Sequence, residues 1–209
     1  VRAVADNDAT AAGGSTSGGV VSVDTAKPTA EIFATTRALV LGSIVGAALT
    51  TPGARTLTVL ARSDDNAAAS LASVGGGVVR VSTGSAEAKV DNGVHLAVGR
   101  VGGTIITTGA IDLQAIQNPG AIAAMTTKGG GAVNVTSNSS NATLTPDLTL
   151  TIAERSTLTS GGRMTIAVRF NTSATPPAGS EVAVVASGAA DTDVITFTAV
   201  HGLTTGMSM

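Results

Sequence analysis

Cysteine, tryptophan and tyrosine are absent from this 209-residue chain, and its only aromatic side chains are three phenylalanines. The absence of cysteine excludes a disulfide framework and thiol chemistry. A compact core usually draws much of its buried area from large aromatic side chains, but the hydrophobic residues here, 43% of the chain, are mostly Ala, Val, Leu and Ile. These small and branched side chains suit a thin, regularly stacked interior.

Charge is also scarce. Charged residues make up 12% of the chain and the formal net charge is −2. No basic cluster is interleaved with aromatic residues that could stack on bases, so we expect no nucleic-acid partner. The low charge combined with a high hydrophobic content also differs from the composition of a disordered chain.

One long uncharged stretch rich in apolar residues extends from Ala38 to Ala54. A membrane-spanning helix needs about 20 apolar residues, and this stretch is shorter and is interrupted by glycines and by Pro52. We therefore expect two short strands with a turn here, and no membrane span. No signal peptide opens the chain and residue 1 is not an initiator Met, so we expect a segment of something longer.

One motif, a glycine pair followed by a short β-forming run, occurs three times. Its copies are residues 18–23 (GGVVSV), 76–81 (GGVVRV) and 130–135 (GGAVNV). A nearly fixed period, here about 54–58 residues, is typical of a repeat architecture.

Two further elements recur with the same period. The first comprises residues 56–62 (TLTVLAR), 110–116 (AIDLQAI) and 163–169 (RMTIAVR), and the second comprises residues 38–41 (ALVL), 95–98 (HLAV) and 148–152 (LTLTI). Apolar residues alternate with other residues in the first element, as in a strand with one buried face.

The spacing of these elements predicts how the chain winds. Val79, Leu96, Leu113 and Val133 follow one another at nearly even intervals, which together make one repeat. We therefore predict an all-β fold, a parallel β-helix (β-solenoid) with about three coils of about 17–20 residues in each repeat of about 54 residues. The repeats would fill residues 1–187, with units at 18–75, 76–129 and 130–187, followed by an atypical tail at 188–209 that starts a further module.

In such a stack, the interior would be a column of Val, Leu, Ile and Ala, with glycine pairs at the corners. Polar insertions at residues 63–66 and 175–177 are expected to form loops.

Several of these segments resemble a known family. Residues 76–90 (GGVVRVSTGSAEAKV) and 130–144 (GGAVNVTSNSSNATL), with strands such as TLTVLAR and MTIAVRF, resemble the filamentous-haemagglutinin-like large exoproteins of bacteria, and residues 194–206 (VITFTAVHGLTTG) are similar to a strand-turn unit of such proteins. The resemblance implies a right-handed parallel β-helix shaft outside the cell that serves adhesion or surface structure.

Residues with catalytic or metal-binding chemistry are few. His95 and His201 are the only histidines, too few for a zinc site without cysteine, and no Gly-x-Ser-x-Gly elbow accompanies them. Residues 128–131 (KGGG) lack the Gly-Lys-Ser/Thr end of a phosphate loop and are interpreted as a coil corner.

Three acidic clusters, at residues 64–66, 91–93 and 191–193, could supply oxygen ligands to calcium. None matches a calcium-binding loop, so we interpret them as solvated turns. We accordingly expect no catalytic residue, no cofactor and no metal site. Glycosylation sequons are present at Asn134, Asn138, Asn141 and Asn171.

These observations favour a non-enzymatic segment of a large extracellular, secreted or surface-exposed bacterial adhesin or fibre. The expected partners are the protein itself, through end-to-end or lateral stacking or further covalent repeats, and a host or neighbouring cell surface. One alternative is a self-assembling filament, sheath or surface-layer subunit. Another is a β-helix carbohydrate-active enzyme or binding module, whose paired carboxylates would come from separate coils.

Overall fold

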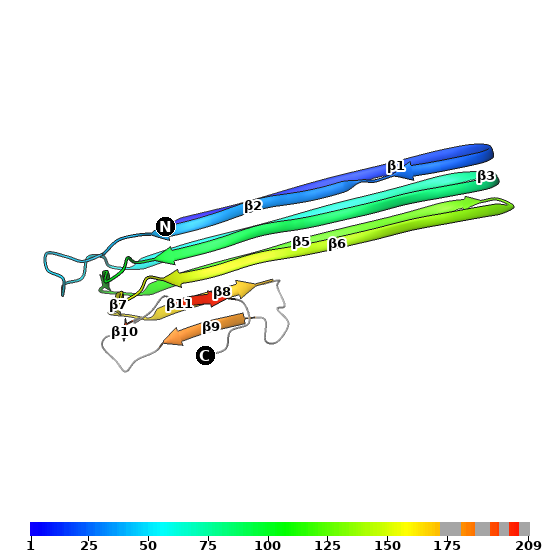
Figure 1. The fold of residues 1–209 in the computed structure, drawn as a ribbon. Coiled ribbons are helices and arrows are strands. Elements are labelled where there is room, and N and C mark those ends of the chain that lie inside the picture. Colours follow the sequence, from blue (N-terminus) through cyan, green and yellow to red (C-terminus); the bar gives the residue numbers. More distant parts are fainter. Residues whose placement is uncertain (172–180, 187–192, 197–200, 205–209) are drawn as a thin grey trace.

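The computed structural model describes residues 1–171, 181–186, 193–196 and 201–204, and all regular structure within these ranges is β. The strands are β1 (Arg2–Ala26), β2 (Thr29–Val40), β3 (Leu57–Val98), β4 (Thr104–Thr107), β5 (Ile111–Gly130), β6 (Val133–Ile152), β7 (Thr157–Ser160), β8 (Met164–Phe170), β9 (Glu181–Ala186), β10 (Asp193–Thr196) and β11 (His201–Thr204). Figure 1 shows a long, narrow blade in which the long strands lie side by side.

Parallel pairing joins equivalent residues of successive repeats. Arg2 pairs with Leu60 between β1 and β3, Leu57 pairs with Ile111 between β3 and β5, and Ile111 pairs with Met164 between β5 and β8. The two partners in each pair therefore lie one full repeat apart along the chain, and one whole repeat makes one rung of the stack. The predicted all-β, mostly parallel character is confirmed.

The prediction that each repeat winds into several short coils is wrong for the described residues, because hydrogen-bonded neighbours lie a full repeat apart. Val79 and Leu96, which the prediction placed in successive coils, lie on the same stretch of β3. Val79 and Leu96 also differ in parity and face opposite sides of the strand, Val79 outward and Leu96 into the core, so their regular spacing does not mark equivalent positions of successive coils.

Each repeat runs out along the blade and back again. The outgoing layer contains residues 2–19, 57–76, 111–130 and 164–170, and the returning layer contains residues 21–40, 79–98 and 133–152. Side chains meet between the layers, as where Ser73 Oγ lies 3.3 Å from Ser82 Oγ. We call the end where each repeat turns from the outgoing into the returning layer the tip, and the opposite end the base (right and left in Figure 1).

The core changes from base to tip. A third, short side formed by β4 and β7 widens the base, and large aliphatic side chains such as Leu96, Ile105 and Leu113 fill it. Beyond the third side only the two layers remain, and the interior there is built mainly from alanines with Leu71 and Val90. Small side chains are required because two directly stacked layers leave little volume between them.

Antiparallel strands pair with the last repeat. β9 pairs with β8, β10 with β7 and β11 with β6. The predicted boundary at residue 187 falls outside the described residues, so it and the predicted repeat units stay predictions.

Ala38 to Ala54 contains the end of β2 and isolated bridges, including an antiparallel bridge from Val45 to Pro52. Of the two predicted strands only the first is present, because the rest of the stretch makes isolated bridges and no continuous ladder. Within the described ranges, no helix is long and apolar enough to cross a membrane.

Candidate functional site

The tip is the part of the blade where the three glycine motifs lie next to one another. Gly18 pairs with Gly76, and Gly76 pairs with Gly130. Gly19 adopts a positive φ of 132°, which a residue with a Cβ rarely adopts, and the chain reverses here into the returning layer. The interpretation of residues 128–131 as a corner is consistent with this turn.

Beyond the turn, the polarity of the strands is inverted. The valines of the motif point outward, with exposed fractions of 64% for Val21 and 69% for Val23, whereas Ser22 is 4% exposed and Arg80 is completely buried. The predicted interior column of Val, Leu, Ile and Ala is therefore wrong at the tip, because the buried residues just after the turn are polar, namely Ser22, Asp24, Arg80 and Ser82.

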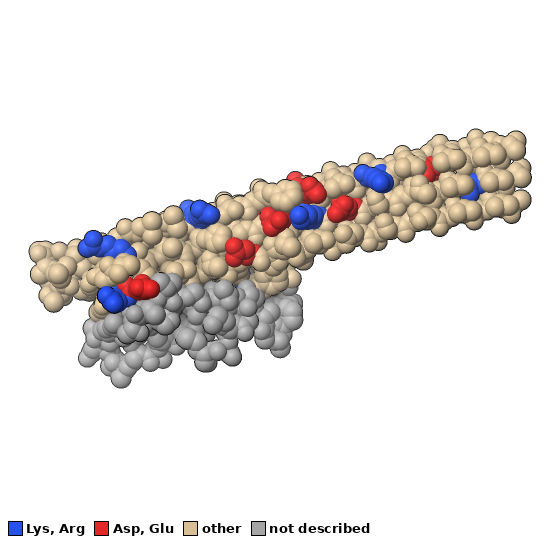
Figure 2. Space-filling model, in the orientation of Figure 1, with Lys and Arg blue, Asp and Glu red and all other residues tan. Residues whose placement is uncertain are grey.

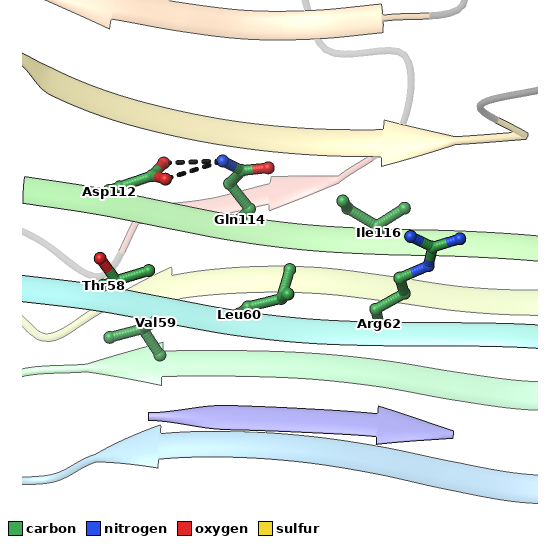
Figure 3. A pocket seen from close by; sticks show the side chains of 7 residues that line it. All are labelled: Thr58, Val59, Leu60, Arg62, Asp112, Gln114 and Ile116. Atoms are coloured by element: carbon green, nitrogen blue, oxygen red, sulfur yellow. Dashed lines mark hydrogen bonds between the residues drawn. The ribbon is translucent and has the colours of Figure 1, made fainter. Parts of the chain in front are cut away.

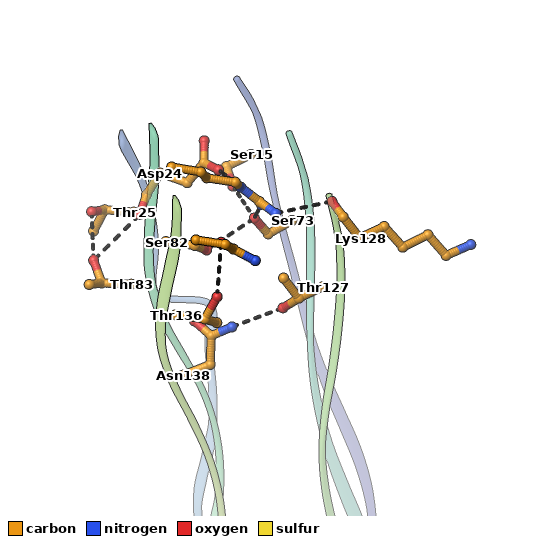
Figure 4. Close-up of polar contacts among 12 residues, drawn as sticks. Ser15, Asp24, Thr25, Ser73, Ser82, Thr83, Thr127, Lys128, Thr136 and Asn138 are labelled. Carbon is orange, nitrogen blue, oxygen red and sulfur yellow. Dashed lines mark hydrogen bonds and ion pairs between the residues drawn. The ribbon is translucent and has the colours of Figure 1, made fainter. Parts of the chain in front are cut away.

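The buried Arg80 guanidinium is bound on several sides. Its Nη2 donates to Asp24 Oδ2 at 3.1 Å and to Ser73 Oγ at 2.8 Å, while its Nη1 donates to the carbonyl oxygen of Lys128 at 3.2 Å. Asp24 is 3% exposed. Figure 4 shows the partners of this guanidinium, Asp24, Ser73 and Lys128, near one another at the tip. The ion pair with Asp24 joins two repeats within the returning layer, and the bonds to Ser73 and Lys128 link this layer to the outgoing one.

The surroundings of Asp24 lower the pKa of its carboxyl group. The largest effect comes from a contact with Ser17, which falls short of full hydrogen-bond geometry and lowers the pKa of Asp24. Burial raises this pKa, and the hydrogen bond and the charge of Arg80 lower it further. The net result is a pKa of Asp24 below its ordinary value of 3.8. Asp24 is thus held ionised as the counter-charge of Arg80.

A second polar cluster lies in the shaft between the aliphatic core of the base and the alanine core. Asp65 is 2% exposed and accepts hydrogen bonds from Asn7, Ser63 and Asn92, and Asn92 in turn accepts from Gln117. The prediction of a loop at residues 63–66 is therefore wrong, as is the prediction of solvated turns at 64–66 and 91–93. Donors from both layers make this carboxylate tolerable in the interior.

Asp64 lies beside this cluster on the outer face. It accepts hydrogen bonds from Arg62 Nε and Asn118 Nδ2, both at 2.6 Å. Burial raises the pKa of Asp64, but the hydrogen bonds from Arg62 and Asn118 outweigh it, so the pKa lies below the ordinary 3.8. In the part of the chain that the structure describes, no three His, Asp or Glu side chains are grouped to hold a metal. The third acidic cluster, at 191–193, is described only from Asp193 onward.

His95 lies half-buried on the outer face of the returning layer. Its Nδ1 is 2.7 Å from Thr149 Oγ1, and its Nε2 is 3.5 Å from Asp147 Oδ2. Both partners belong to the next repeat, so His95 links repeats. The side chain of His201 lies outside the described residues.

A shallow hollow of about 250 Å³ lies between β3 and β5 near the base (Figure 3). Its lining residues are Thr58, Val59, Leu60, Arg62, Asp112, Gln114 and Ile116. Asp112 is the single carboxylate among them, and Gln114 donates to both of its oxygens at 2.9 Å. The hollow lacks the facing carboxylate pair that glycoside hydrolysis requires.

Three of the four sequons lie on β6, and the fourth follows β8. Asn134 and Asn141 are exposed on β6, and Asn138 is half-buried and donates to Thr127 Oγ1 at 2.8 Å. Asn171 is exposed just after β8 and has a φ of 58°. Charged side chains of both signs are interspersed along the face seen in Figure 2, with no continuous patch of one sign.

Comparisons with protein-family models, curated proteins and solved structures give no match for this chain. The resemblance to filamentous-haemagglutinin-like exoproteins therefore stays a prediction based on sequence motifs.

The tip is the feature that the sequence reasoning missed. A signal for it was present: Ser22, Arg80 and Asn134 occupy the same position in three motifs, with apolar residues on either side. Equivalent polar residues between valines indicate a polar row on one face and an apolar row on the other.

Proposed function

We propose that this chain is a structural segment of a large extracellular surface protein or fibre, in which the repeats form a β-solenoid shaft and perform no catalysis. The observation that carries the proposal is the unbroken pairing between repeats. Every residue of β5 and every residue of β6 pairs with β3. Backbone hydrogen bonds along whole strands make such a stack stiff.

The placement of polar side chains also supports a structural role. Asp65, Arg80 and Asp112, which carry the chemistry that a site would use, are hydrogen-bonded to neighbouring side chains of this chain. The bonds of Asp65 and Arg80 fix repeats and layers against one another, and the bond of Asp112 lies within β5.

The extracellular setting rests on the resemblance of residues 76–90 and 130–144 to bacterial exoproteins. Adhesion to a host or neighbouring cell would use the exposed faces and the tip of the shaft. A filament, sheath or surface layer without an adhesive role would use the same shaft.

The test is stepwise unfolding under force. Since the native chain has no cysteine, handles can be attached through Val1→Cys and Arg163→Cys, both at exposed positions. We expect three steps, each of roughly 190 Å, the extended length of one repeat at about 3.5 Å per residue. Each step would release one repeat from its neighbour.

A matched control carries the handles at Val1 and Arg55, which is also exposed, and spans one repeat, so it should give one step of this size. Gradual extension at low force, without steps, would contradict the role of a shaft.

A further inference from the structure

An apolar surface covers one side of the tip. We call it the valine face and define it as two rows on the outer side of the returning layer, Val21, Val79 and Val133 in one row and Val23, Val81 and Val135 in the other. The edge members are 51–69% exposed. Val20 and Val78 extend this surface to the turn, with exposed fractions of 73% and 55%.

The size of this surface is unusual for an isolated chain. Together these valines expose roughly 600 Å², at the upper end of the largest apolar patch that a typical monomer presents, and such patches usually mark interaction sites. Pairing in register makes the surface a regular grid of β-branched side chains.

The opposite side of the tip differs. The corresponding outer rows of the outgoing layer pair Thr16 with Val74 and Lys128, and Gly14 with Ala72 and Thr126. Apart from Val74, which is 49% exposed, these residues are small, polar or charged, so the apolar grid is confined to one side of the tip.

The surroundings of the valine face favour a partner without charge. The next row is formed by Thr25, Thr83 and Ser137, and the nearby charges of Arg80 and Asp24 are buried against each other. A lipid surface is disfavoured because peripheral membrane binding relies on aromatic and basic anchors, whereas the chain has no Trp or Tyr.

We propose that the valine face binds the valine face of a second copy of this chain. Two sheet faces of β-branched side chains pack about 10 Å apart, as in a β-sandwich, and a two-fold axis brings identical rows together. Two faces would bury roughly 1,200 Å², the lower limit of a specific interface. The pair is therefore a weak, concentration-dependent dimer.

The two shafts extend in opposite directions, so that only the tips overlap. Further along the same outer face, Lys89 forms an ion pair with Asp91 at 3.7 Å and lies 4.9 Å from the centre of the Phe33 ring. Shafts side by side in one direction would place Lys89 close to its own copy. Opposed shafts avoid this repulsion and join two blades into one longer rod, which extends the proposed structural role.

The first experiment is sedimentation equilibrium of the 209-residue chain between about 1 and 500 µM. We expect a monomer–dimer equilibrium. The triple variant Val21→Thr, Val23→Thr and Val135→Thr keeps β-branched side chains but removes apolar surface, and it should raise the dissociation constant at least about tenfold. The control Val74→Thr with Ile122→Thr makes the same kind of change on the outgoing layer, where both residues are exposed, and should leave dimerisation unchanged.

The second experiment tests the geometry by oxidation of single-cysteine variants. Val81→Cys lies in the middle repeat of the valine face and should form a disulfide-linked dimer, while Val74→Cys should not. The far-ultraviolet circular dichroism spectrum checks that each variant is folded.

A monomer at every concentration would overturn the proposal, as would a dimer that is insensitive to the triple variant. Binding of phosphatidylcholine vesicles by a monomeric chain, lost in the triple variant, would also overturn it and assign the face to lipid. Unfolding in repeat-sized steps is measured on single molecules, so a monomer that still unfolds in steps would refute the dimer and leave the proposed shaft intact.

Discussion

Gly75 and Gly129 lie against Arg80 in the interior of the tip. A Cβ on Gly129 would collide with Arg80 Nη1 and with the carbonyl oxygen of Gly75, and a Cβ on Gly75 would lie 2.6 Å from Ser17 Oγ. The buried guanidinium and the glycines are therefore linked, since the side chain occupies the space that a Cβ would fill.

Replacement of Gly129 by alanine should consequently destabilise the chain. We expect Gly129→Ala to lower the free energy of unfolding by about 1–3 kcal/mol through overpacking, measured by urea denaturation. Gly130→Ala is the matched control, because nothing lies within 4 Å of a Cβ there, and its effect should stay within about 0.5 kcal/mol. Equal effects at both positions would contradict the packing of Arg80 against Gly129.

The lowered pKa of Asp24 predicts a stability that depends on pH. A carboxyl whose folded-state pKa lies below its unfolded value stabilises the fold above the unfolded value and loses this contribution as the pH falls through the folded one. The urea midpoint should therefore fall as the pH drops below about 3.8, the ordinary value.

In Asp24→Asn, this part of the decrease should be missing, and the midpoint at pH 7 should be lower because Arg80 loses its counter-charge. Urea midpoints between pH 2 and 7 provide the measurement. Parallel pH profiles for both proteins would show that Asp24 does not contribute.

At the scale of one element, the alternating strand β3 passes through three different parts of the interior, at the base, in the shaft and at the tip. Inward residues change from Val59 at the base to Ala67 in the shaft, and then to Ser73 and Arg80 at the tip, all at most 3% exposed. Alternation is visible in the sequence and predicts a strand with two different faces. It does not say which face is covered.

The same substitution on opposite faces tests this inversion. Val59→Thr places a hydroxyl group in the apolar core at a fully buried position and should reduce the free energy of unfolding by about 1–3 kcal/mol. Val21→Thr, at an exposed position, should change it by less than about 0.5 kcal/mol when it is measured at concentrations where the chain is monomeric. A large loss for Val21→Thr in the monomer would mean that the valines of the glycine motif face inward.

At the scale of the whole molecule, each repeat contacts its neighbours through matched registers. The shift from Leu57 in β3 to Ile111 in β5 equals the shift from Val79 in β3 to Val133 in β6, so the outgoing and returning layers advance together. Removal of one repeat should then preserve the register, whereas a deletion that is one residue longer should invert the faces beyond the junction.

Deletion of residues 68–121, one full period, joins Ala67 to Ile122 and should leave a folded chain whose stack is shorter by one rung, that is, by one repeat. Its stability should be lower, because Arg80 and Asn92 are removed. Deletion of residues 68–122 is the control and should abolish cooperative unfolding, since it turns the interior residues of the following stretch outward. Circular dichroism during thermal unfolding separates the two outcomes, and equal behaviour would contradict pairing by repeat.

The sequence alone determined the all-β character, the repeat period and the glycine turns, because these follow from composition and from spacing along the chain. It did not determine the winding, since apolar residues in a long alternating strand match one another at many separations. Only the tertiary structure decided which face is interior. Asp65 is buried because donors such as Asn92 face it from the other layer, and the valines of the tip are exposed because Arg80 and Asp24 form a pair inside it. The first arrangement depends on residues that meet across the two layers and the second on residues of neighbouring repeats, in both cases at separations along the chain that no local pattern reveals.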